Sequence, residues 1–402
     1  MVIDNSAILT DLDPDQIAVV SAIRGPVCVI AGAGTGKTRV ITNRIAYAIN
    51  AGVTDPTKVL ALTFTAKAAG EMRSRLRTLG ISNAAARTFH SAALKQLLYF
   101  WPYAFGGQFP TLLTTKSGFI SQAISRAEVA MPASVNALRE IAGEIEWAKV
   151  LEISPDNYQQ EAIASSRSVR LPNNKSEDEN LAMISQVYEA YESLKKQERC
   201  LDFEDVLLLT VGMLEEDRGV RERVRDQYRY FTVDEYQDVS PLQQRLLNLW
   251  LGNREEICVV GDAAQTIYSF AGASSNFLLT FKNRFPNAQV FRLTRGYRCT
   301  PEIINAANQI VAKKLSVRET ESLVKNISLD KEDKGFKVKP AKERDIVQVE
   351  EELSDLLGAQ VQINLKKKVK RHGVVEQQGE TIISFGSLDE LNGLIERLRK
   401  NS

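Results

Sequence analysis

The 402 residues, 44% of them hydrophobic and 25% charged, have the composition of a globular protein with room for two or three domains. They contain no apolar run of about 18 residues, and the first residues are acidic where a secretory signal is basic and then apolar, so we expect neither a membrane span nor export. The net charge of +1 identifies no partner, because nucleic-acid binding depends on where the cations cluster.

The cysteines stand alone in the sequence, and the chain has only two histidines. A structural zinc site needs four such ligands at close spacing, and a disulfide framework needs a secreted context. We therefore expect buried free thiols in a reducing cytoplasm at Cys28, Cys200, Cys258 and Cys299.

Short apolar runs alternate with longer helical patterns through the first three quarters of the chain. The runs predict buried strands at Val27–Ile30, Val59–Phe64, Phe231–Val233, Ile257–Val260 and Gln289–Leu293. Because helical segments separate them, an α/β fold with a parallel sheet is predicted. Residues from about 105 to 199 differ, since they are mostly helical, with patterns over Leu138–Leu151 and Leu181–Gln197. They predict a helical subdomain inserted into the α/β fold.

The composition changes near residue 312, because only two of the 29 aromatic residues, Phe336 and Phe385, lie beyond it. The charged segment Asp330–Lys342 suits a linker. The remaining tail predicts a small α+β domain that is too small to bury its apolar faces alone, so we expect oligomerisation. Its predicted elements are, in order, helix Ile346–Leu357, strand Gln360–Leu365, a basic run, strand Glu380–Phe385 and a final helix with the stripe Leu388, Leu391, Leu394, Ile395 and Leu398.

A glycine-rich segment, Ala31–Thr38, follows the first predicted strand and precedes a helix through about Ile49. Small residues let such a loop curl so that backbone N–H groups face a polyphosphate at a helix N-terminus. Lys37 would then reach the β- and γ-phosphates, and the Thr38 hydroxyl would coordinate Mg²⁺. The motif departs from the strict pattern by one residue, Ala31, and the plain alternative is a glycine-rich turn before an ordinary helix.

Two carboxylates, Asp234 and Glu235, end the apolar run that begins at Tyr230. This arrangement suits a metal-holding Asp234 and a Glu235 that polarises an attacking water molecule. Adjacent acids at a strand end are also common on solvated surfaces. The phosphate loop earlier in the chain favours the catalytic interpretation.

The order of these motifs resembles that of superfamily 1 DNA helicases of the UvrD, Rep and PcrA type. The resemblance covers about 300 residues and implies a RecA-like P-loop NTPase lobe, ATP and Mg²⁺ as cofactors, and DNA unwinding coupled to ATP hydrolysis, as in DNA repair. Its segments are Leu12–Gln16 (the Q motif), Leu62–Met72 (motif Ia), Thr88–Ser91, Asp234–Asp238 (motif II), Val260–Tyr268 (motif III) and Leu293–Arg298 (motif IV).

The resemblance assigns roles to matching residues. It implies that Gln265 senses the γ-phosphate and that Arg298 acts as an arginine finger, so the candidate catalytic residues are Glu235, Gln265 and Arg298. It implies an ATP site in which Gln16 reads adenine and Tyr297 stacks on it, formed by Gln16, Gly32, Gly34, Thr35, Gly36, Lys37, Thr38, Arg39 and Tyr297, with the metal held by Thr38 and Asp234. It also implies a single-stranded DNA path along Phe64, Thr65, His90 and Tyr268. Taken singly, Phe64 and Tyr268 could be core residues, and His90 could be a helix-start histidine.

Departures from the family pattern concern DNA contacts and the second half of the motor. Ala66, Ala271 and Gly296 replace residues that the family usually has as asparagine, arginine and a polar residue. After about residue 312 we find no counterpart of motifs V and VI. We therefore expect ATP binding with very slow hydrolysis, little stimulation by single-stranded DNA and no unwinding, because an arginine finger contributes roughly 10³ to 10⁵ in rate.

The tail resembles the end of a ParB chromosome-partition protein, beginning at Leu315–Glu321. In that family the C-terminal domain dimerises, and its lysine-rich strand binds DNA without sequence preference. Five cations match that strand and could neutralise several phosphates, although a solubilising surface run is the alternative. They are Lys366, Lys367, Lys368, Lys370 and Arg371.

The two resemblances together predict the domain plan and the function. The plan is a RecA-like lobe (1–104 and 200–294), a helical insertion (105–199), the start of a truncated second lobe (295–312), a ParB-like segment and linker (313–342) and a ParB-like dimerisation domain (343–402). The join near Ala312 indicates a gene fusion, a frame-joined pseudogene or an assembly artefact. We expect an ATP- and single-strand-binding helicase fragment, bacterial, cytoplasmic and nucleoid-associated, that forms a homodimer and binds duplex DNA through its tail. The rival functions are an ATP-gated DNA-binding module and a partition-type DNA-bridging dimer.

Overall fold

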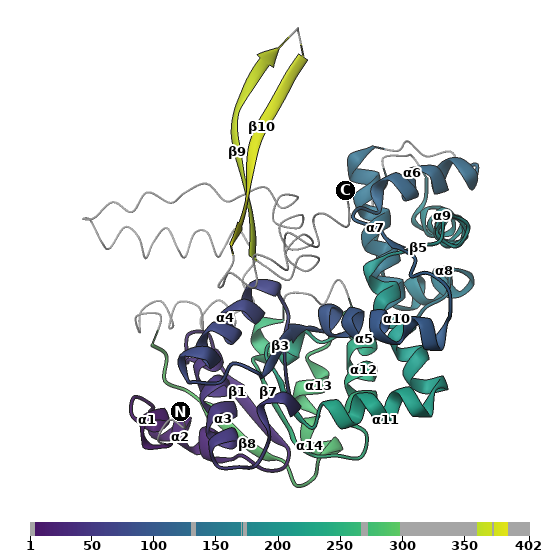
Figure 1. Ribbon diagram of the computed structural model, residues 1–402. Coiled ribbons are helices and arrows are strands. Elements are labelled where there is room, and N and C mark those ends of the chain that lie inside the picture. Colours follow the sequence, from purple (N-terminus) through teal and green to yellow (C-terminus); the bar gives the residue numbers. More distant parts are fainter. Residues whose placement is uncertain are drawn as a thin grey trace.

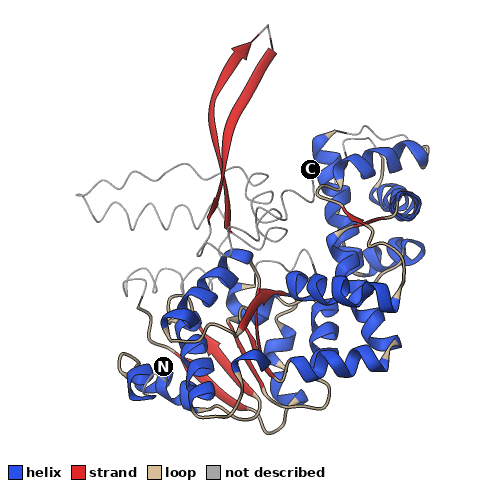
Figure 2. Ribbon diagram, in the orientation of Figure 1, coloured by secondary structure: helices blue, strands red, loops and turns tan. Residues whose placement is uncertain are grey.

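A six-stranded parallel sheet forms the centre of the protein in this computed structural model, which describes residues 5–129, 134–169, 171, 175–266, 272–297, 360–371 and 374–384 (Figures 1 and 2). The strand order is β3-β2-β6-β7-β1-β8, and every neighbouring pair is parallel. This confirms the predicted fold class. The strands are β1 (Val27–Ala31), β2 (Val59–Thr63), β3 (Ala85–Thr88), β6 (Tyr230–Val233), β7 (Ile257–Gly261) and β8 (Gln289–Leu293).

Both faces of the sheet are buried, which explains why its strands are near-continuous apolar runs. Side chains alternate along a strand, so Val59 and Ala61 join one hydrophobic cluster while Leu60 and Leu62 join the other. The first cluster is completed by α1 (Asn5–Leu9), α2 (Pro14–Ser21), α3 (Lys37–Asn50) and α4 (Ala66–Thr78). The second is completed by α5 (Phe89–Ala104), α10 (Phe203–Glu216), α11 (Arg218–Gln227), α12 (Pro241–Leu251), α13 (Asn276–Leu279) and α14 (Phe281–Arg284).

Sequence patterns located five of the six strands to within about one residue at each end and missed the edge strand β3. Its sequence, Ala-Ala-Arg-Thr, contains no large apolar side chain. It is a strand because its backbone pairs with β2, with Leu60 beside Ala85 and Thr63 beside Thr88. A strand that is held mainly by backbone pairing has no hydrophobic pattern in its sequence, so the sequence analysis could not predict it.

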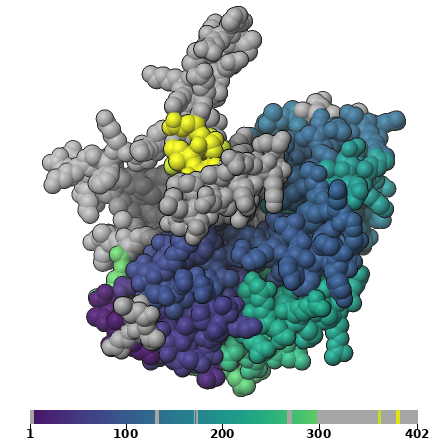
Figure 3. Space-filling model, in the orientation of Figure 1, coloured from purple at the N-terminus to yellow at the C-terminus, as the bar shows by residue number. Residues whose placement is uncertain are grey.

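The inserted helices form a raised lobe on one side of the sheet domain (Figures 1 and 3). They bury a third hydrophobic cluster of their own, in which Ile141, Ile145, Ile184 and Tyr191 have no exposed surface. Two short parallel strands, β4 (Thr111–Leu112) and β5 (Cys200–Leu201), pair where the chain leaves and re-enters the sheet domain. The helices are α6 (Ser117–Arg126), α7 (Val135–Val150), α8 (Pro155–Ala164) and α9 (Glu177–Glu198), and three single turns, η1 (Pro56–Lys58), η2 (Tyr236–Asp238) and η3 (Ala263–Gln265), lie in the sheet domain.

A long antiparallel hairpin, β9 (Gln360–Arg371) with β10 (Val374–Ser384), forms the described part of the tail and projects away from the sheet domain (Figure 1). The prediction of two short strands separated by a basic run was wrong in one respect. The basic run belongs to β9, where Lys370 pairs with Val375 and Lys368 with Gln377. The predicted helices 346–357 and 387–399 lie outside the described residues.

Two of the cysteines, Cys28 and Cys258, are buried free thiols as predicted, whereas Cys200 is free but only half-buried. Burial raises the pKa of the Cys28 thiol to about 12, so it is protonated at neutral pH. Cys299 lies outside the described residues. Within the described ranges, every helix is too short or too polar to cross a membrane.

Candidate nucleotide-binding site

The glycine-rich loop joins β1 to the N-terminus of α3. Gly34 and Gly36 have φ angles of 74° and 84°, a left-handed conformation that glycine adopts without strain. Gly36 is also the N-cap of α3 and provides no side-chain cap. The first N–H groups of the helix are therefore left for another acceptor, and the positive end of the helix dipole favours an anion there.

Hydrogen bonds among residues outside the loop, and from them to its backbone, hold the phosphate loop in this shape. Gln16, which is 2% exposed, donates its amide N–H to the Thr35 carbonyl oxygen at 3.0 Å and accepts a hydrogen bond from the Asp13 N–H at 3.3 Å. The Tyr297 hydroxyl donates to the Asp13 carboxylate, and the Tyr297 N–H donates to the Gly34 carbonyl oxygen at 2.8 Å. Residues 13, 16 and 297, far apart in sequence, thus converge on the loop.

The two acids at the end of β6 face the loop directly. The Lys37 ammonium lies 3.0 Å from a Glu235 carboxylate oxygen, and the Thr38 hydroxyl lies 3.5 Å from an Asp234 carboxylate oxygen. Glu235 has φ 50° and ψ 43°, a left-handed conformation that is rare for a residue with a long side chain. Such a conformation persists only when its surroundings enforce it, and it is typical of functional sites.

The Asp234 carboxyl is the most perturbed group of this site. Burial raises its pKa to about 7, the neighbouring Glu235 charge adds to the rise, and Lys37 only partly offsets it. A carboxylate that is 6% exposed and short of positive charge is suited to receive a cation.

A chain of amides and carboxylates extends the site to the end of β7. The Gln237 amide donates to Glu235 at 3.0 Å, and its carbonyl oxygen accepts from the Asp262 N–H at 2.9 Å. The Asp262 carboxylate in turn accepts from the Gln265 amide at 2.6 Å. The predicted residues Glu235 and Gln265 are therefore linked through Gln237 and Asp262, which lie within motifs II and III but received no role of their own from the sequence. The first residue after a central parallel strand is a signal that could have identified Asp262.

Comparison with known proteins agrees with this arrangement. The profile of the UvrD/REP helicase N-terminal domain matches residues 12–286, which include the phosphate loop, the acid pair and the β7 end. The chain belongs to this family. A second profile, the ParB dimerisation domain, matches residues 342–399, which agrees with the resemblance of the tail.

Individual relatives give the same result. The chain is 47% identical over 323 residues to a protein named ATP-dependent DNA helicase UvrD2 of Mycobacterium tuberculosis (strain ATCC 25618 / H37Rv), an alignment that covers 78% of this chain and 45% of the relative. It is 33% identical over 301 residues to ATP-dependent DNA helicase PcrA of Leuconostoc citreum, covering 74% of this chain and 38% of the relative. The chain thus spans less than half the length of these curated relatives.

The close packing around Gly261 gives a test of the site's rigidity. A Cβ atom there would lie 2.5 Å from the Gln237 side-chain oxygen, 3.0 Å from Leu278 Cδ2 and 3.2 Å from the Gln237 backbone nitrogen. We expect Gly261→Ala to lower the free energy of unfolding by about 1–3 kcal/mol, because the backbone neighbour cannot rotate away. Urea unfolding measures this, with Gly118→Ala as the control.

The control glycine lies in helix α6, where an added Cβ meets nothing within 4 Å. Because Gly118 is the second residue of α6, where helix propensity counts for less than in a helix interior, Gly118→Ala should change the free energy of unfolding by less than about 0.5 kcal/mol. Equal effects of the two substitutions would show that the β7 end accommodates a side chain.

The family's single-strand path would begin at the ends of β2 and β3. Thr65 is the N-cap of α4, where its hydroxyl accepts from the Ala68 N–H at 3.1 Å, and Phe64 is half-buried beside it. His90 lies within the capping box that Thr88 and Ser91 form at the start of α5, and its ring meets the Phe203 ring edge-on at 6.1 Å between centroids. Burial lowers the pKa of His90, so its imidazole is neutral at pH 7.

The remaining residues predicted for the nucleotide and DNA sites lie near the loop, in β9 or outside the described residues. Arg39, just after the loop, is half-buried, with its guanidinium 3.7 Å from the Asp11 carboxylate. Tyr268 and Arg298 lie outside the described residues. The backbone of β9 contains Lys366, Lys367, Lys368, Lys370 and Arg371.

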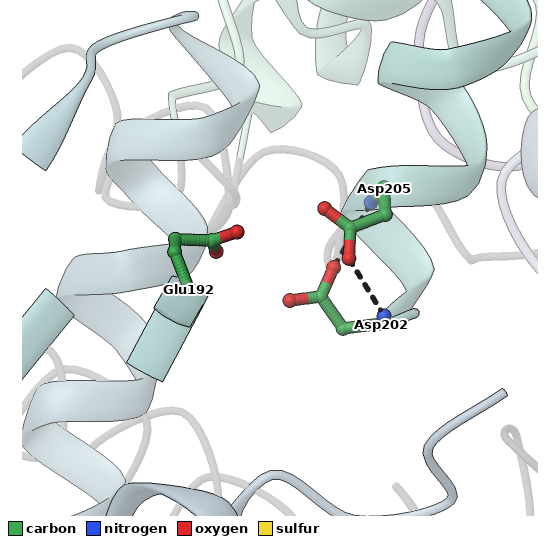
Figure 4. Close-up of side chains that lie close together, drawn as sticks. All are labelled: Glu192, Asp202 and Asp205. Atoms are coloured by element: carbon green, nitrogen blue, oxygen red, sulfur yellow. Dashed lines mark hydrogen bonds between the residues drawn. The ribbon is translucent and has the colours of Figure 1, made fainter. Parts of the chain in front are cut away.

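A second group of carboxylates, Glu192 with Asp202 and Asp205, lies at the junction of α9 and α10, and its side chains point toward one another (Figure 4). Their oxygens lie within 4.8 Å of one another, close enough to hold a metal ion. The Lys149 ammonium, however, contacts all three, at 3.2 Å from Glu192, 2.8 Å from Asp202 and closer still to Asp205. A lysine therefore already provides the positive charge, and the group is an ion-pair cluster.

Proposed function

We propose that the sheet domain is the ATP-binding and hydrolysing lobe of a DNA helicase. The observation that carries this proposal is the approach of Lys37 and Thr38, on the phosphate loop, to Glu235 and Asp234 on β6. The loop and the lysine would bind the phosphates of ATP. Glu235, whose side chain is 37% exposed, is positioned to take a proton from water.

The site also suits Mg²⁺. Oxygen ligands are those that Mg²⁺ prefers, and the Thr38 hydroxyl and the Asp234 carboxylate would hold it. The raised pKa of Asp234 fits this role, because a divalent cation would supply the positive charge that the carboxylate lacks. When bound, Mg²⁺ would neutralise charge that develops on the transferring phosphoryl group.

Replacing Lys37 with alanine tests the nucleotide site. The fluorescence of a labelled ATP analogue should report affinity at least tenfold weaker, because the loop loses its charge-assisted hydrogen bonds to the phosphates. Lys282→Ala removes an exposed lysine from α14 and should leave affinity unchanged. Equal affinity of Lys37→Ala and the unaltered protein would refute the proposed site.

Single-stranded DNA is the proposed nucleic-acid substrate of this lobe. Phe64, Thr65, His90 and Tyr268 would contact the strand. Gln265 would sense the γ-phosphate, and Arg298 would act as an arginine finger. Tyr297 would stack on adenine. Its side chain is 53% exposed, and the centre of its ring lies 5.4 Å from the Arg295 guanidinium. Gln16 would read adenine, and its buried amide, which donates to the Thr35 carbonyl oxygen and accepts from the Asp13 N–H, would also hold the loop in place. The protein would act on the bacterial nucleoid in the cytoplasm.

The tail is proposed to form a homodimer and to bind duplex DNA through Lys366, Lys367, Lys368, Lys370 and Arg371. The match to the ParB dimerisation domain supports this proposal. Burying the leucine stripe of the final helix predicted from the sequence would provide several kcal/mol, at roughly 1.5–3 kcal/mol for each fully buried side chain.

Light scattering on the full chain tests the dimer. We expect twice the chain mass of 44.8 kDa at micromolar concentration. Changing Leu391 and Leu394 to glutamate should give the single mass, because charges would then lie in the apolar stripe. A mass of one chain for the unaltered protein would exclude the dimer. Duplex binding that depends on salt but not on ATP would favour the DNA-bridging alternative.

A further inference from the structure

Helix α5 exposes a group of large apolar side chains near its C-terminus. Leu98 is 49% exposed, Tyr99 77%, Tyr103 64% and Phe105, which caps the helix, 43%. The opposite side of the same helix is buried in the core of the sheet domain. Large exposed apolar side chains grouped at one end of a helix mark a candidate binding surface.

Cations lie along the same face. Lys95 is one helical turn before Tyr99, and Tyr99 one turn before Tyr103, so the three side chains form a row. The nearby Arg87 charge, together with partial burial, lowers the pKa of Lys95, which indicates that these two cations repel each other. At the other end of the row, the Arg223 guanidinium lies 5.7 Å from the centre of the Tyr103 ring.

Acidic residues near this row are already engaged with other arginines. On α11, Glu222 pairs with Arg225 at 3.2 Å and Asp226 pairs with Arg229 at 2.8 Å. Among the residues that the structure describes, Arg223 contacts the Tyr103 ring and makes no ion pair, so its charge is open to an anion. The row combines flat aromatic faces with Lys95 at one end and Arg223 at the other, and an incoming anion near Lys95 would offset the repulsion between Lys95 and Arg87.

We propose that this face of α5 binds single-stranded nucleic acid, with bases stacked on Tyr99 and Tyr103 and phosphates near Lys95, Arg87 and Arg223. Stacking requires exposed rings, and phosphate binding requires cations within reach, and the row provides both. An acidic protein would use the cations but would not require the ring faces. This binding requires no ATP and goes beyond the proposed function.

The proposed surface is distinct from the nucleotide site and from the strand path at His90. With a rise of about 1.5 Å per residue, Tyr99 and Tyr103 lie about 15 and 21 Å along the helix from Phe89. A strand bound at His90 could continue along α5 to this surface.

The test uses the full chain without nucleotide and a fluorescent oligothymidylate that contains 5-iodouracil. Changing Tyr99 and Tyr103 together to serine should weaken binding about tenfold or more, since stacking contributes about 1–3 kcal/mol per base. The double change to phenylalanine keeps both rings and should retain affinity. Ile163→Ser, which alters a 51% exposed apolar residue on α8, is the matched control.

Photo-cross-linking and peptide mapping identify the contact directly. Cross-links to peptides containing Tyr99 or Tyr103, retained in Lys37→Ala, would support the proposal even if the nucleotide site fails its own test. Unchanged affinity of the serine variant, or cross-links confined to other peptides, would overturn it. A change of mass in light scattering with unchanged oligonucleotide binding would also overturn it and would identify a protein-binding surface.

Discussion

Replacing Glu235 with glutamine is expected to slow ATP hydrolysis by about 10² to 10⁴-fold while leaving ATP binding nearly unchanged. Glutamine has almost the same shape but accepts no proton from water. The carboxylate is held in place by the Lys37 ammonium and the Gln237 amide, each 3.0 Å away. Its left-handed backbone fixes the side chain at the end of β6. The effect should therefore fall on the chemical step.

Phosphate release under single-turnover conditions measures this effect, because protein in excess over ATP makes a slow step visible. Glu255→Gln is the matched control, since it removes an exposed carboxylate just before β7. Labelled-nucleotide affinity, measured in parallel, separates catalysis from binding. Equal rates for Glu235→Gln and the unaltered protein would show that another group activates the water.

The sequence was sufficient to predict those parts of the site that a local motif specifies. Lys37 and Thr38 follow a strand and begin a helix, and Asp234 and Glu235 end another strand, so the sheet brings them together. The strand order was not needed for this prediction, because carboxyl ends of parallel strands share one edge. Buried apolar runs likewise predicted the central strands.

Features that depend on contacts between distant residues could not be predicted. Gln237 and Asp262 join the site through hydrogen bonds that only the adjacent placement of β6 and β7 allows. β3 lacks a hydrophobic pattern and depends on its neighbour β2. Lys149 and Asp202 are separated by 53 residues, and no sequence pattern indicates that both are buried.

The Asp202 carboxylate is the centre of the ion-pair cluster and should be the most sensitive position for stability outside the nucleotide site. It is 1% exposed and lies 2.8 Å from the Lys149 ammonium and 2.9 Å from the Lys195 ammonium. Tyr191 also donates its hydroxyl to Asp202 at 3.0 Å. Asp202→Asn retains an N-cap for α10 but removes the charge, which leaves two buried ammonium groups poorly compensated. We expect the free energy of unfolding to fall by about 3–5 kcal/mol.

Urea unfolding followed by tryptophan fluorescence, to which Trp147 of the inserted helices contributes, measures the loss. Asp178→Asn, which alters an exposed acid in the first turn of α9, is the matched control. Burial acts to raise the pKa of Asp202, but Lys149 and Lys195 outweigh it and hold the pKa well below the usual 3.8. A carboxyl whose pKa is lower in the folded than in the unfolded protein stabilises the fold at any pH above its unfolded-state pKa. That stabilisation is lost as the pH falls through its folded-state pKa. The difference in the free energy of unfolding between the unaltered protein and Asp202→Asn should therefore have its full size at pH 7. It should become smaller only below about pH 4. A difference that is small at pH 7, or that does not change in acid, would mean that Glu192 and Asp205 suffice to compensate the two lysines.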